Sequence, residues 1–230
     1  MTVTEFQQWL NAHGASIAVD GKGGPATRAA ILQVFTNKSA PAITETELRS
    51  ISAFLGDPLG QRLRAVAQVE ASGAGWFDSG LPKILYERHY FWRLTEGRYG
   101  VTDWSNPKAG GYTIDANGND VIDSWEKLAF AACKDPMAAF SSVSMGKFQI
   151  MGAHWHKLGY KSPVEMMWEA RRSEVAQYDM VARYIHEFGL RDEFLAMSPN
   201  PDDCRAFAKG YNGSGYEKFK YHEKLARWMR

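Results

Sequence analysis

The stretch "RLRAVAQVEASGAGW" (residues 62–76) continues an apolar helical pattern that ends with a glutamate and then breaks into glycine and serine. Leu63, Val66 and Glu70 recur at steps of three and four residues, which is the spacing of one helix face. We therefore expect Glu70 on or beside the buried face, at the C-terminal end of its helix. Desolvation and the negative end of the helix dipole both raise a carboxyl pKa, so this position suits a general acid. The alternative is a Glu70 side chain that points into water at a frayed helix end.

The composition is that of an ordinary globular protein. The 230 residues are 45% hydrophobic and 23% charged, enough for one sizeable domain with a small module or for two modest domains. The net charge of +1 gives no general attraction to nucleic acid, so no nucleic-acid partner is expected. Cys133 and Cys204 are too few for a disulfide scaffold and lack zinc-site spacing, so we predict no metal and no cofactor.

The N-terminal part reads as a small helical unit followed by a linker. Thr4 can cap a first helix that carries Phe6, and Pro25 suits the first turn of a second helix. The pattern of residues 1–38 is compatible with a separate module and with a helical arm packed on the rest of the chain. Residues 39–46 form the predicted linker. The N-terminus has no basic start and no uninterrupted apolar segment, so we expect no signal peptide.

The rest of the chain is predicted to be mostly helix. Thr44 and Glu47 have capping-box spacing and Gly56 suits a helix end, so a helix is expected between them. The region 77–118 has short apolar runs between glycine-rich turns and reads as irregular, with a small hairpin. From Asp123 onward the helical pattern returns. The expected fold class is mainly α, with a small β-hairpin region.

Two glycine-containing turns carry polar side chains at positions that read as buried. "SVSMGKFQIMG" (142–152) places the Gln149 amide inside a tight apolar turn, and "FAKGYNGSGY" (207–216) presents Tyr211 and Asn212 before two glycines. Buried polar groups need hydrogen-bond partners, and the hydroxyl and acetamido groups of a sugar supply them. Each turn taken alone is also compatible with an ordinary core turn.

Four stretches together resemble the N-acetylmuramidase domain of modular bacteriophage endolysins. They are "VEASGAGWF" (69–77), "ILYERHYFW" (84–92), "SMGKFQIMG" (144–152) and "YNGSGYEKFKYHEKLA" (211–226). The resemblance covers residues 47–230 and implies an α+β lysozyme-like catalytic domain, related in general plan to goose-type lysozyme and soluble lytic transglycosylases.

A second resemblance concerns residues 1–38. "FQQWLNAHG" (6–14) and "VDGKGGPATRAAILQVF" (19–35) resemble the small three-helix peptidoglycan-binding domain. The residues that carry this resemblance, and that it implies for wall binding, are Asp20, Gly24, Thr27 and Arg28.

The resemblance implies hydrolysis of the β-1,4 bond between N-acetylmuramic acid and N-acetylglucosamine in peptidoglycan, for phage-driven lysis of the host. It assigns Glu70 as the general acid and Glu87 as the second carboxylate, either a base for water or a nucleophile. A carboxyl separation of about 5 Å would indicate retention, and one of about 6.5 to 9.5 Å inversion. Glu87 is alternatively the ion partner of Arg88 or of another neighbour. The implied substrate-binding residues are Ser144, Gln149, Tyr211, Asn212, His89 and Tyr160.

Two other functions remain open on the sequence. A lytic transglycosylase cleaves the same bond without water and needs one catalytic acid, so a dispensable Glu87 would favour it. A catalytically silent protein that keeps the fold for adhesion would bind cell walls without clearing a suspension of permeabilised cells.

The resemblance also implies synthesis in the host cytoplasm and action on the cell wall in the periplasm, after another protein permeabilises the membrane. Peptidoglycan glycan strands are the expected partner, and a monomer is expected. Residues 216–230 hold five basic and two acidic side chains. This balance suits the C-terminal end of a helix through the helix dipole, and it is also compatible with contact to the outer membrane.

One loop has part of a calcium-binding pattern. "DANGNDVIDSWE" (115–126) has Asp or Asn at the first, third and fifth positions of an EF-hand loop and Glu126 at the twelfth. The sixth position, which needs glycine for a sharp turn, is Asp120. Asp123 and Glu126 also have capping-box spacing for the helix that follows. We favour the helix cap, which explains both carboxylates without a metal.

Overall fold

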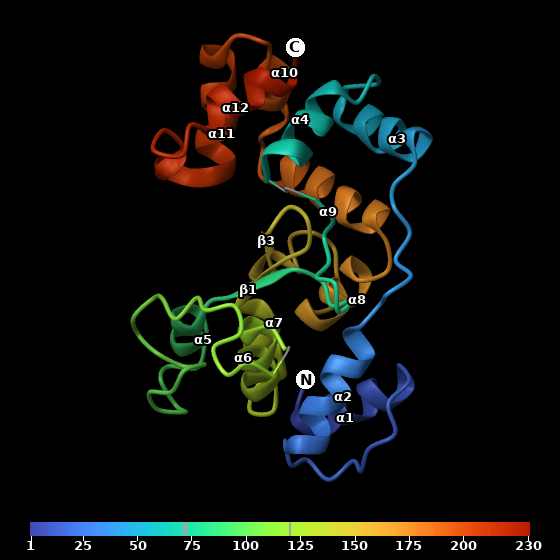
Figure 1. Ribbon diagram of the computed structural model, residues 1–230, viewed down its shortest axis with the longest axis vertical. Helices are drawn as coiled ribbons and strands as arrows, with labels where there is room; N and C mark the ends of the chain where they lie inside the picture. Colours follow the sequence, from blue (N-terminus) through green and yellow to red (C-terminus); the bar gives the residue numbers. More distant parts are fainter. Residues whose placement is uncertain (71–72, 120) are drawn as a thin grey trace.

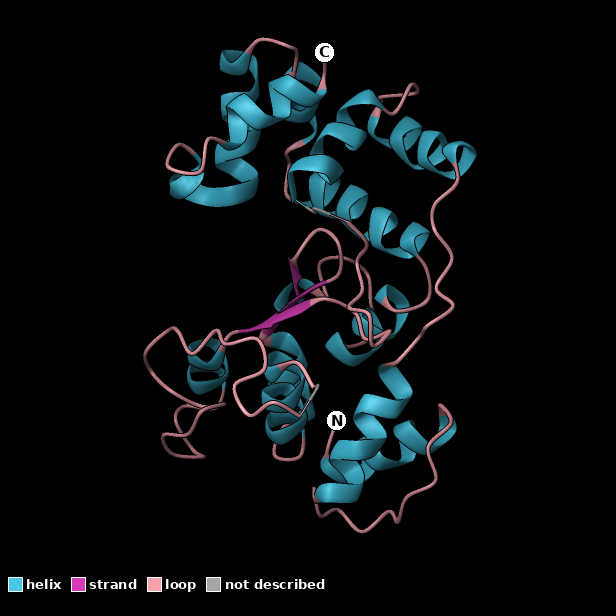
Figure 2. Cartoon of the chain, in the orientation of Figure 1, coloured by secondary structure: helices cyan, strands magenta, loops and turns pink. Residues whose placement is uncertain are grey.

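Helices make up most of the chain, and a small sheet lies near its centre (Figures 1 and 2). The computed structural model describes residues 1–70, 73–119 and 121–230, without the side chain of Glu70. Within these residues, β1 (Ile84–Tyr86), β2 (Val143–Met145) and β3 (Ile150–Met151) form an antiparallel sheet in that order. The predicted mainly α fold with a small β region is confirmed.

The longest stretch without a helix or strand between two described elements is 95–122, between α5 and α6. The α-helices are α1 (Val3–Ala12), α2 (Pro25–Phe35), α3 (Glu45–Leu55), α4 (Gln61–Glu70), α5 (Arg88–Leu94), α6 (Asp123–Ala132), α7 (Pro136–Ser141), α8 (Pro163–Ala170), α9 (Glu174–Glu187), α10 (Arg191–Ala196), α11 (Arg205–Asn212) and α12 (Tyr221–Trp228). The 3₁₀-helices are η1 (Gly152–His154), η2 (Pro201–Cys204) and η3 (Gly213–Tyr216). Across the described part of the chain, no helix combines the length and the apolar character needed to cross a membrane.

Local signals set the ends of α2 and α3 as predicted. Pro25 occupies the first turn of α2. Thr44 and Glu47 form a capping box at the start of α3, in which each side chain accepts a hydrogen bond from the backbone of the other residue. Gly56 ends α3 with φ 92°, a left-handed conformation that glycine adopts without steric cost.

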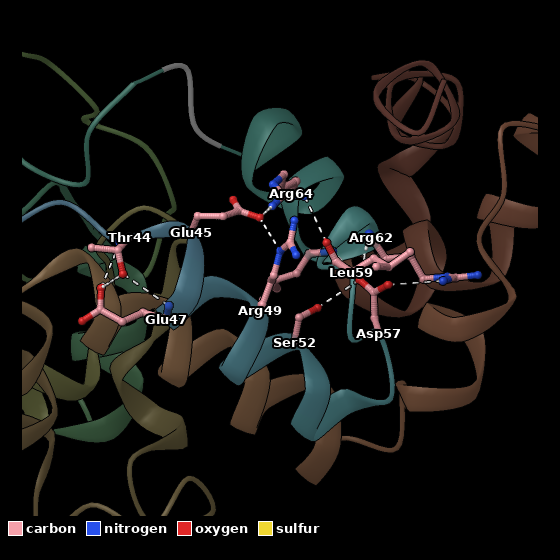
Figure 3. A network of polar contacts seen from close by, with 10 residues as sticks. Thr44, Glu45, Glu47, Arg49, Ser52, Asp57, Leu59, Arg62 and Arg64 are labelled. Carbon is pink, nitrogen blue, oxygen red and sulfur yellow. Dashed lines mark hydrogen bonds and ion pairs between the residues drawn. The ribbon is translucent and has the colours of Figure 1, made fainter.

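A polar network fixes the corner between α3 and α4 (Figure 3). The buried Asp57 carboxylate accepts hydrogen bonds from Ser52 Oγ and from Arg62 N, both at 2.9 Å. The second of these bonds satisfies a backbone donor in the first turn of α4. Arg64 of α4 also pairs with Glu45 of α3. The network therefore sets the direction of α4, the helix that ends at the predicted general acid.

The sheet joins segments that are far apart in the sequence. Leu85 of β1 lies opposite Ser144 of β2, and Ser144 lies opposite Met151 of β3. The hairpin is therefore at 143–151 and not within 77–118, where β1 is the one strand. An isolated bridge joins Trp76, just before that region, to Pro82. The sequence prediction placed the hairpin wrongly because β1 pairs with a partner almost sixty residues further on.

Helices α1 and α2, here called the N-terminal pair, pack on the main body (Figure 1). The ring of Phe35 lies 5.2 Å from that of Phe140 and 5.7 Å from that of Trp125, measured between centroids. Trp9 Nε1 donates a hydrogen bond to Glu165 Oε1 at 2.8 Å. Buried side chains of the pair and of the main body belong to one hydrophobic cluster. Of the two arrangements compatible with the sequence, the contacts are those of a packed arm.

The N-terminal pair differs in detail from the sequence expectation. Residues 1–38, all of them described, contain two α-helices where the resemblance implies three. Thr2 caps α1 in place of the predicted Thr4, because Glu5 lies three residues after Thr2 and completes a capping box with it.

Residues 36–44 run from α2 to α3 along the main body (Figure 1). Asn37 N donates to Gly80 O at 2.8 Å near the start of this segment. Ile43 N donates to Glu174 Oε2 at 2.9 Å near its end. Because α3 begins at Glu45, the predicted linker 39–46 overlaps the helix by two residues.

The C-terminal helix α12 packs on α4 and leaves aromatic side chains exposed. Leu225 is buried, and Gln61 Nε2 of α4 donates to Met229 O at 2.8 Å. In contrast, Trp228 at the end of α12 is 53% exposed and Phe219, just before the helix, is 56% exposed.

Candidate active site

Two glycines shortly after α4 in the sequence contact the sheet region. Glu70 is the last residue of α4, as predicted, and its side chain lies outside the described part of the structure. Further along, Lys147 Nζ donates to Gly73 O at 2.9 Å, and Lys83 N donates to Gly75 O at 2.8 Å. Residues 73–75 therefore lie against the start of β1 and against the turn between β2 and β3.

Glu87 stands between β1 and α5. Its backbone N donates to Ser142 O at 2.8 Å, which extends the ladder between β1 and β2. Its carboxylate accepts a hydrogen bond from Tyr112 Oη at 2.6 Å, and His89 Nδ1 lies 3.2 Å from the same oxygen. The Glu87 side chain is 18% exposed. The Tyr112 hydrogen bond thus holds a carboxylate that solvent still reaches, whereas His89 Nδ1 lies close to it without forming a hydrogen bond. No ion pair joins Glu87 to Arg88 among the described contacts.

Glu87 and Ser144 lie on the same face of the sheet. Leu85 is paired with Ser144, and side chains two residues apart along an extended chain share a face. Ile84 and Tyr86, whose side chains take the other face, are 5% and 2% exposed and belong to the core. The predicted second carboxylate and a predicted sugar-binding hydroxyl are therefore brought together.

The β2–β3 turn is held by its own polar groups. Ser144 Oγ donates to Gln149 Oε1 at 2.8 Å, and Gln149 Nε2 donates to Gly146 O at 2.9 Å. Gln149 adopts φ 50°, which is uncommon for a residue other than glycine and persists only where the surroundings impose it. Tyr211 Oη donates to Phe148 O in the same turn at 3.1 Å. Ser144, Gln149 and Tyr211 are therefore one connected group.

Tyr211 and Asn212 form the last turn of α11 and are both partly exposed. The Tyr211 ring lies 5.5 Å from the ring of Tyr184 and 5.5 Å from that of Phe207. These contacts fix the orientation of the Tyr211 hydroxyl toward the β2–β3 turn.

A buried glutamine that the sequence analysis missed supports this turn from α9. Gln177 is 2% exposed, and its Oε1 accepts a hydrogen bond from Lys147 N at 2.6 Å. Lys147 Nζ also lies 3.0 Å from Glu174 Oε1. A Cβ at Gly75 or at Gly146 would overlap the Gln177 side chain. The available signal was a polar residue within the otherwise apolar side of the helix at 174–187.

Tyr160 lies apart from this group. It lines a cavity of about 320 Å³ together with Glu165, Glu169 and Arg183. Burial raises the pKa of Tyr160 to about 12. The described lining of that cavity contains none of the other predicted substrate-binding residues, so a role for Tyr160 in binding stays a prediction.

Two of the predicted wall-binding residues are engaged by a buried amide. Gln7, 1% exposed, donates from Nε2 to Asp20 Oδ1 at 3.0 Å and to Thr27 Oγ1 at 3.2 Å. Gln7 Oε1 accepts from Asp20 N at 3.1 Å. The pKa of Asp20 lies below its ordinary value because the backbone N–H of Lys22 and the Gln7 amide donate to its carboxylate. These groups hold the connection between α1 and α2.

The other two wall-binding candidates face α6. The guanidinium carbon of Arg28 lies 4.2 Å from the centroid of the Phe130 ring. Gly24 is the N-cap of α2, and its carbonyl oxygen lies 4.0 Å from Cys133 Sγ. At the neighbouring Gly23 an added Cβ would lie 2.3 Å from Cys133 Cβ, so this close approach requires glycine.

Two carboxylates of α6, Asp123 and Glu126, accept hydrogen bonds from the loop that precedes the helix. Thr113 Oγ1 donates to Asp123, and the side-chain amides of Asn117 and Asn119 donate to Glu126 at 3.0 Å and 2.7 Å. The predicted capping box is wrong, because α6 begins at Asp123 itself and both carboxylates reach back to the loop. The sixth position of the EF-hand pattern lies outside the described residues. Where the chain is described, no three or more His, Cys, Asp or Glu side chains are grouped to hold a metal ion.

Comparisons with known proteins identify the family to which this chain belongs. Residues 60–230 match the N-acetylmuramidase family. Among solved structures, the chain is similar to the Burkholderia AP3 phage endolysin, with 28% sequence identity and a TM-score of 0.70, over 100% of this chain and 94% of that one. A search among curated proteins finds no match. Because the family match covers more than half of the chain and includes the end of α4, the sheet and α11, the protein belongs to the N-acetylmuramidase family, and it is a glycoside hydrolase that acts on peptidoglycan.

Proposed function

We propose that the chain cleaves the β-1,4 bond between N-acetylmuramic acid and N-acetylglucosamine with Glu70 as general acid and Glu87 as second carboxylate. The observation that carries this proposal is the position of the sheet. Its β1 strand leads directly to Glu87, and its β2–β3 turn contacts Gly73, three residues after Glu70 in the sequence. Glycosidases need two carboxyl groups on either side of the scissile bond, and this sheet brings two such segments together.

In this proposal, Glu70 donates a proton to the leaving oxygen while Glu87 acts as an anion. Tyr112 Oη donates a hydrogen bond to the Glu87 carboxylate at 2.6 Å and thereby orients it. The charged Glu87 either takes a proton from the attacking water or attacks the anomeric carbon. Tyr112 is thus a positioning residue for Glu87.

The connected group of Ser144, Gln149 and Tyr211, with Asn212 beside it, is proposed to orient the sugar. Internal hydrogen bonds fix the Gln149 amide in place before substrate arrives. A preorganised polar group costs little further ordering when it binds a ligand. We extend the same role to His89, beside Glu87, and to Tyr160.

The test is mass spectrometry of fragments released from purified peptidoglycan. We expect reducing muramic-acid ends from the native chain, and about 10²-fold or greater loss of release for Glu70→Gln and for Glu87→Gln. Glu187→Gln, a surface glutamate at the end of α9, is the matched control and should keep full activity. Circular dichroism should show each variant folded.

Two outcomes would replace the proposal. Anhydromuramic ends together with an active Glu87→Gln variant would establish a lytic transglycosylase. Wall binding without any released fragment would establish a catalytically silent adhesion protein.

We propose further that residues 1–38 contribute wall binding, that residues 39–46 are the linker and that residues 47–230 carry the catalysis. The resemblance of residues 1–38 to a peptidoglycan-binding domain supports this division. The part of the pair open to a polymer is the connection between its helices, where Val19 is 41% exposed and Lys22 is exposed.

Deleting the N-terminal pair is a poor test of wall binding, because it removes part of the core. We instead expect the double variant Val19→Ser with Lys22→Gln, made in a Glu87→Gln background, to sediment less with purified cell walls. An unchanged bound fraction in a folded variant would refute wall binding by this connection.

The likeness to a phage endolysin supports a role in phage-driven host lysis, with action in the periplasm after the membrane is permeabilised. We propose that the protein acts as a monomer and that its basic C-terminal segment contacts the outer membrane. Light scattering coupled to gel filtration tests the first point, and a dimer mass would contradict it.

A further inference from the structure

A large cavity opens beside the predicted second carboxylate. It has a volume of about 840 Å³. Arg88 and Gly111 both line it, and these two residues are the chain neighbours of Glu87 and Tyr112, which are hydrogen-bonded to each other. The cavity therefore begins one residue away from the site proposed for bond cleavage.

Two cations in the cavity wall have no ion pair with a described carboxylate. Arg88 Nε donates to Lys108 O at 3.0 Å, and Lys127 Nζ donates to Gly111 O. Both bonds go to backbone carbonyls. Lys127 also attracts the nearby Asp123 carboxylate, whose pKa is lowered first by the hydrogen bond from Thr113 and to a lesser extent by the Lys127 charge. The carboxylates of Asp123 and Glu126 also line the cavity. They accept hydrogen bonds from neutral groups of the loop over 113–119, which bring no positive charge to them.

The cavity also offers apolar contacts and a carboxylate. Trp104 and Phe130 line it, and the Phe130 side chain is 42% exposed. Asp103 lines it as well and forms no ion pair with a described cation. The wall thus combines two cations, three carboxyl groups, of which Asp103 has no described hydrogen bond to the loop over 113–119, and two aromatic rings.

We propose that this cavity binds the peptide stem of the muramic acid whose glycosidic bond is cut. This inference rests on the function proposed above. The stem is attached through the lactyl ether of muramic acid, so it starts on the same sugar that the catalytic carboxylates must contact. The glycan itself is uncharged apart from these substituents, whereas the stem carries free carboxylates and, where it contains a diamino acid, an ammonium group.

The assignment of groups follows from charge. Arg88 and Lys127 bind stem carboxylates, because hydrogen bonds between charged partners are the strong ones. Asp103 binds an ammonium group, and Trp104 with Phe130 contacts the apolar parts of the stem. Peptide-bearing strands are therefore preferred over stripped strands.

The test is calorimetric titration of the full chain with the free tetrapeptide stem, L-alanyl-γ-D-glutamyl-diaminopimelyl-D-alanine, which the enzyme does not cut. We expect Lys127→Gln to raise the dissociation constant about tenfold or more, since it removes a charge-assisted contact. Lys127→Arg should restore most of the affinity. Lys134→Gln is the matched control, because Lys134 is exposed just after α6 and does not line the cavity.

A second titration uses free N-acetylmuramic acid, which has the lactyl carboxylate and no peptide. It should bind much more weakly than the tetrapeptide. Equal binding of the two would assign the cations to the lactyl group and overturn the proposal, as would an undiminished affinity in Lys127→Gln or an equal loss in Lys134→Gln.

The kinetic arm compares cleavage of peptide-bearing strands with cleavage of strands stripped by an amidase. We expect the native chain to favour the peptide-bearing strands and Lys127→Gln to lose that preference. A native chain that cuts both equally and does not bind tetrapeptide would overturn the stem site while leaving the muramidase assignment intact. Failure to cut either substrate would instead count against the catalytic proposal, and the titrations would still decide the stem site.

Discussion

At the N-terminus, α1 and α2 place Phe6, Leu10 and Phe35, all fully buried, in the core of the main body. At the C-terminus, α12 buries one side and leaves Trp228 and the preceding Phe219 more than half exposed. The two ends have helices of similar length, yet one end uses its aromatic side chains for folding and the other presents them to solvent.

This difference shows that the residues which resemble a binding motif need not be the residues whose side chains are free to bind. The N-terminal residues that resemble a wall-binding domain are largely engaged by Gln7 and by α6. The C-terminal segment has no comparable wall-binding motif, but a cavity of about 500 Å³ there is lined by Lys220, Lys224, Arg227 and Arg230, together with Glu223, which pairs with Lys220 at 3.5 Å. Contacts with other molecules are expected where charged side chains are not occupied by the fold.

The largest expected effect is on stability at the N-terminal end. Phe35→Ala should lower the free energy of unfolding by about 3–5 kcal/mol, because it removes a fully buried ring from a shared core. Trp228→Ala, the matched change at the other end, should cost about 0.5 kcal/mol or less. Urea denaturation followed by circular dichroism measures both. If Phe35→Ala instead produced a separate unfolding transition at lower urea, with the main transition unchanged, the N-terminal pair would be an independent module. That result would contradict the shared core at this end of the chain.

A smaller effect is expected from the buried amide of the pair. Gln7→Leu keeps the volume of the side chain approximately but leaves Asp20 N, Gly21 N and Thr27 without their partner. We expect a loss of about 1–3 kcal/mol in unfolding free energy. Gln33→Leu on exposed α2 surface is the control, since its single bond to Gly14 O is long at 3.3 Å. Equal stability of Gln7→Leu and the native chain would show that the connection does not depend on this amide.

At the C-terminal end, charge removal should change binding and not folding. Replacing Lys220, Lys224, Arg227 and Arg230 by glutamine should shift stability by about 0.5 kcal/mol or less, because these side chains are at the surface. Each charge lost should weaken attraction to anionic membranes by about 1 kcal/mol at low salt. Flotation with anionic lipid vesicles, and lysis of intact cells added from outside, measure the effect. Unchanged flotation would remove the proposed membrane contact while leaving cleavage of purified peptidoglycan unaffected.

The smallest expected effect is an acid-dependent difference at Asp20. Its pKa in the folded chain is lowered by hydrogen bonds from Lys22 N and Gln7, so its contribution to stability is present above the unfolded pKa of about 4. That contribution disappears as the pH falls through the lower folded value. The difference in melting temperature between the native chain and Asp20→Asn should therefore shrink between pH 6 and pH 3. A constant difference over that range would mean that the carboxylate charge does not stabilise the connection.

The parts of the fold that the sequence predicted are those set by neighbouring residues. The Thr44 and Glu47 capping box, Pro25 at the start of α2 and Gly56 at the end of α3 are local signals, and all three are confirmed. The hairpin was misplaced because the partner of β1 lies at 143–145, and no local pattern carries that information.

The candidate site divides in the same way. The end of α4 at Glu70 follows from helical periodicity, and the position of Gln149 in a tight turn follows from the local pattern, whereas Ser144 was implied by the family resemblance alone. Tyr112, which donates to Glu87 from a residue 25 positions away, has no periodic or turn signal that links it to that carboxylate. Long-range polar contacts of this kind depend on the packed fold, and the spacing of residues in the sequence does not predict them.

The close approach of Gly23 to Cys133 also bears on recombination between lysins. A side chain at position 23 would overlap the backbone and the Cβ of Cys133. The connection between α1 and α2 and the end of α6 therefore have complementary shapes. A hybrid enzyme that joined this pair to the body of a relative would keep the fit only if it also carried the facing residues of α6 and α8. The N-terminal pair is therefore exchangeable between enzymes only together with the residues of α6 and α8 that it contacts. A junction placed in the linker alone would separate the pair from these residues.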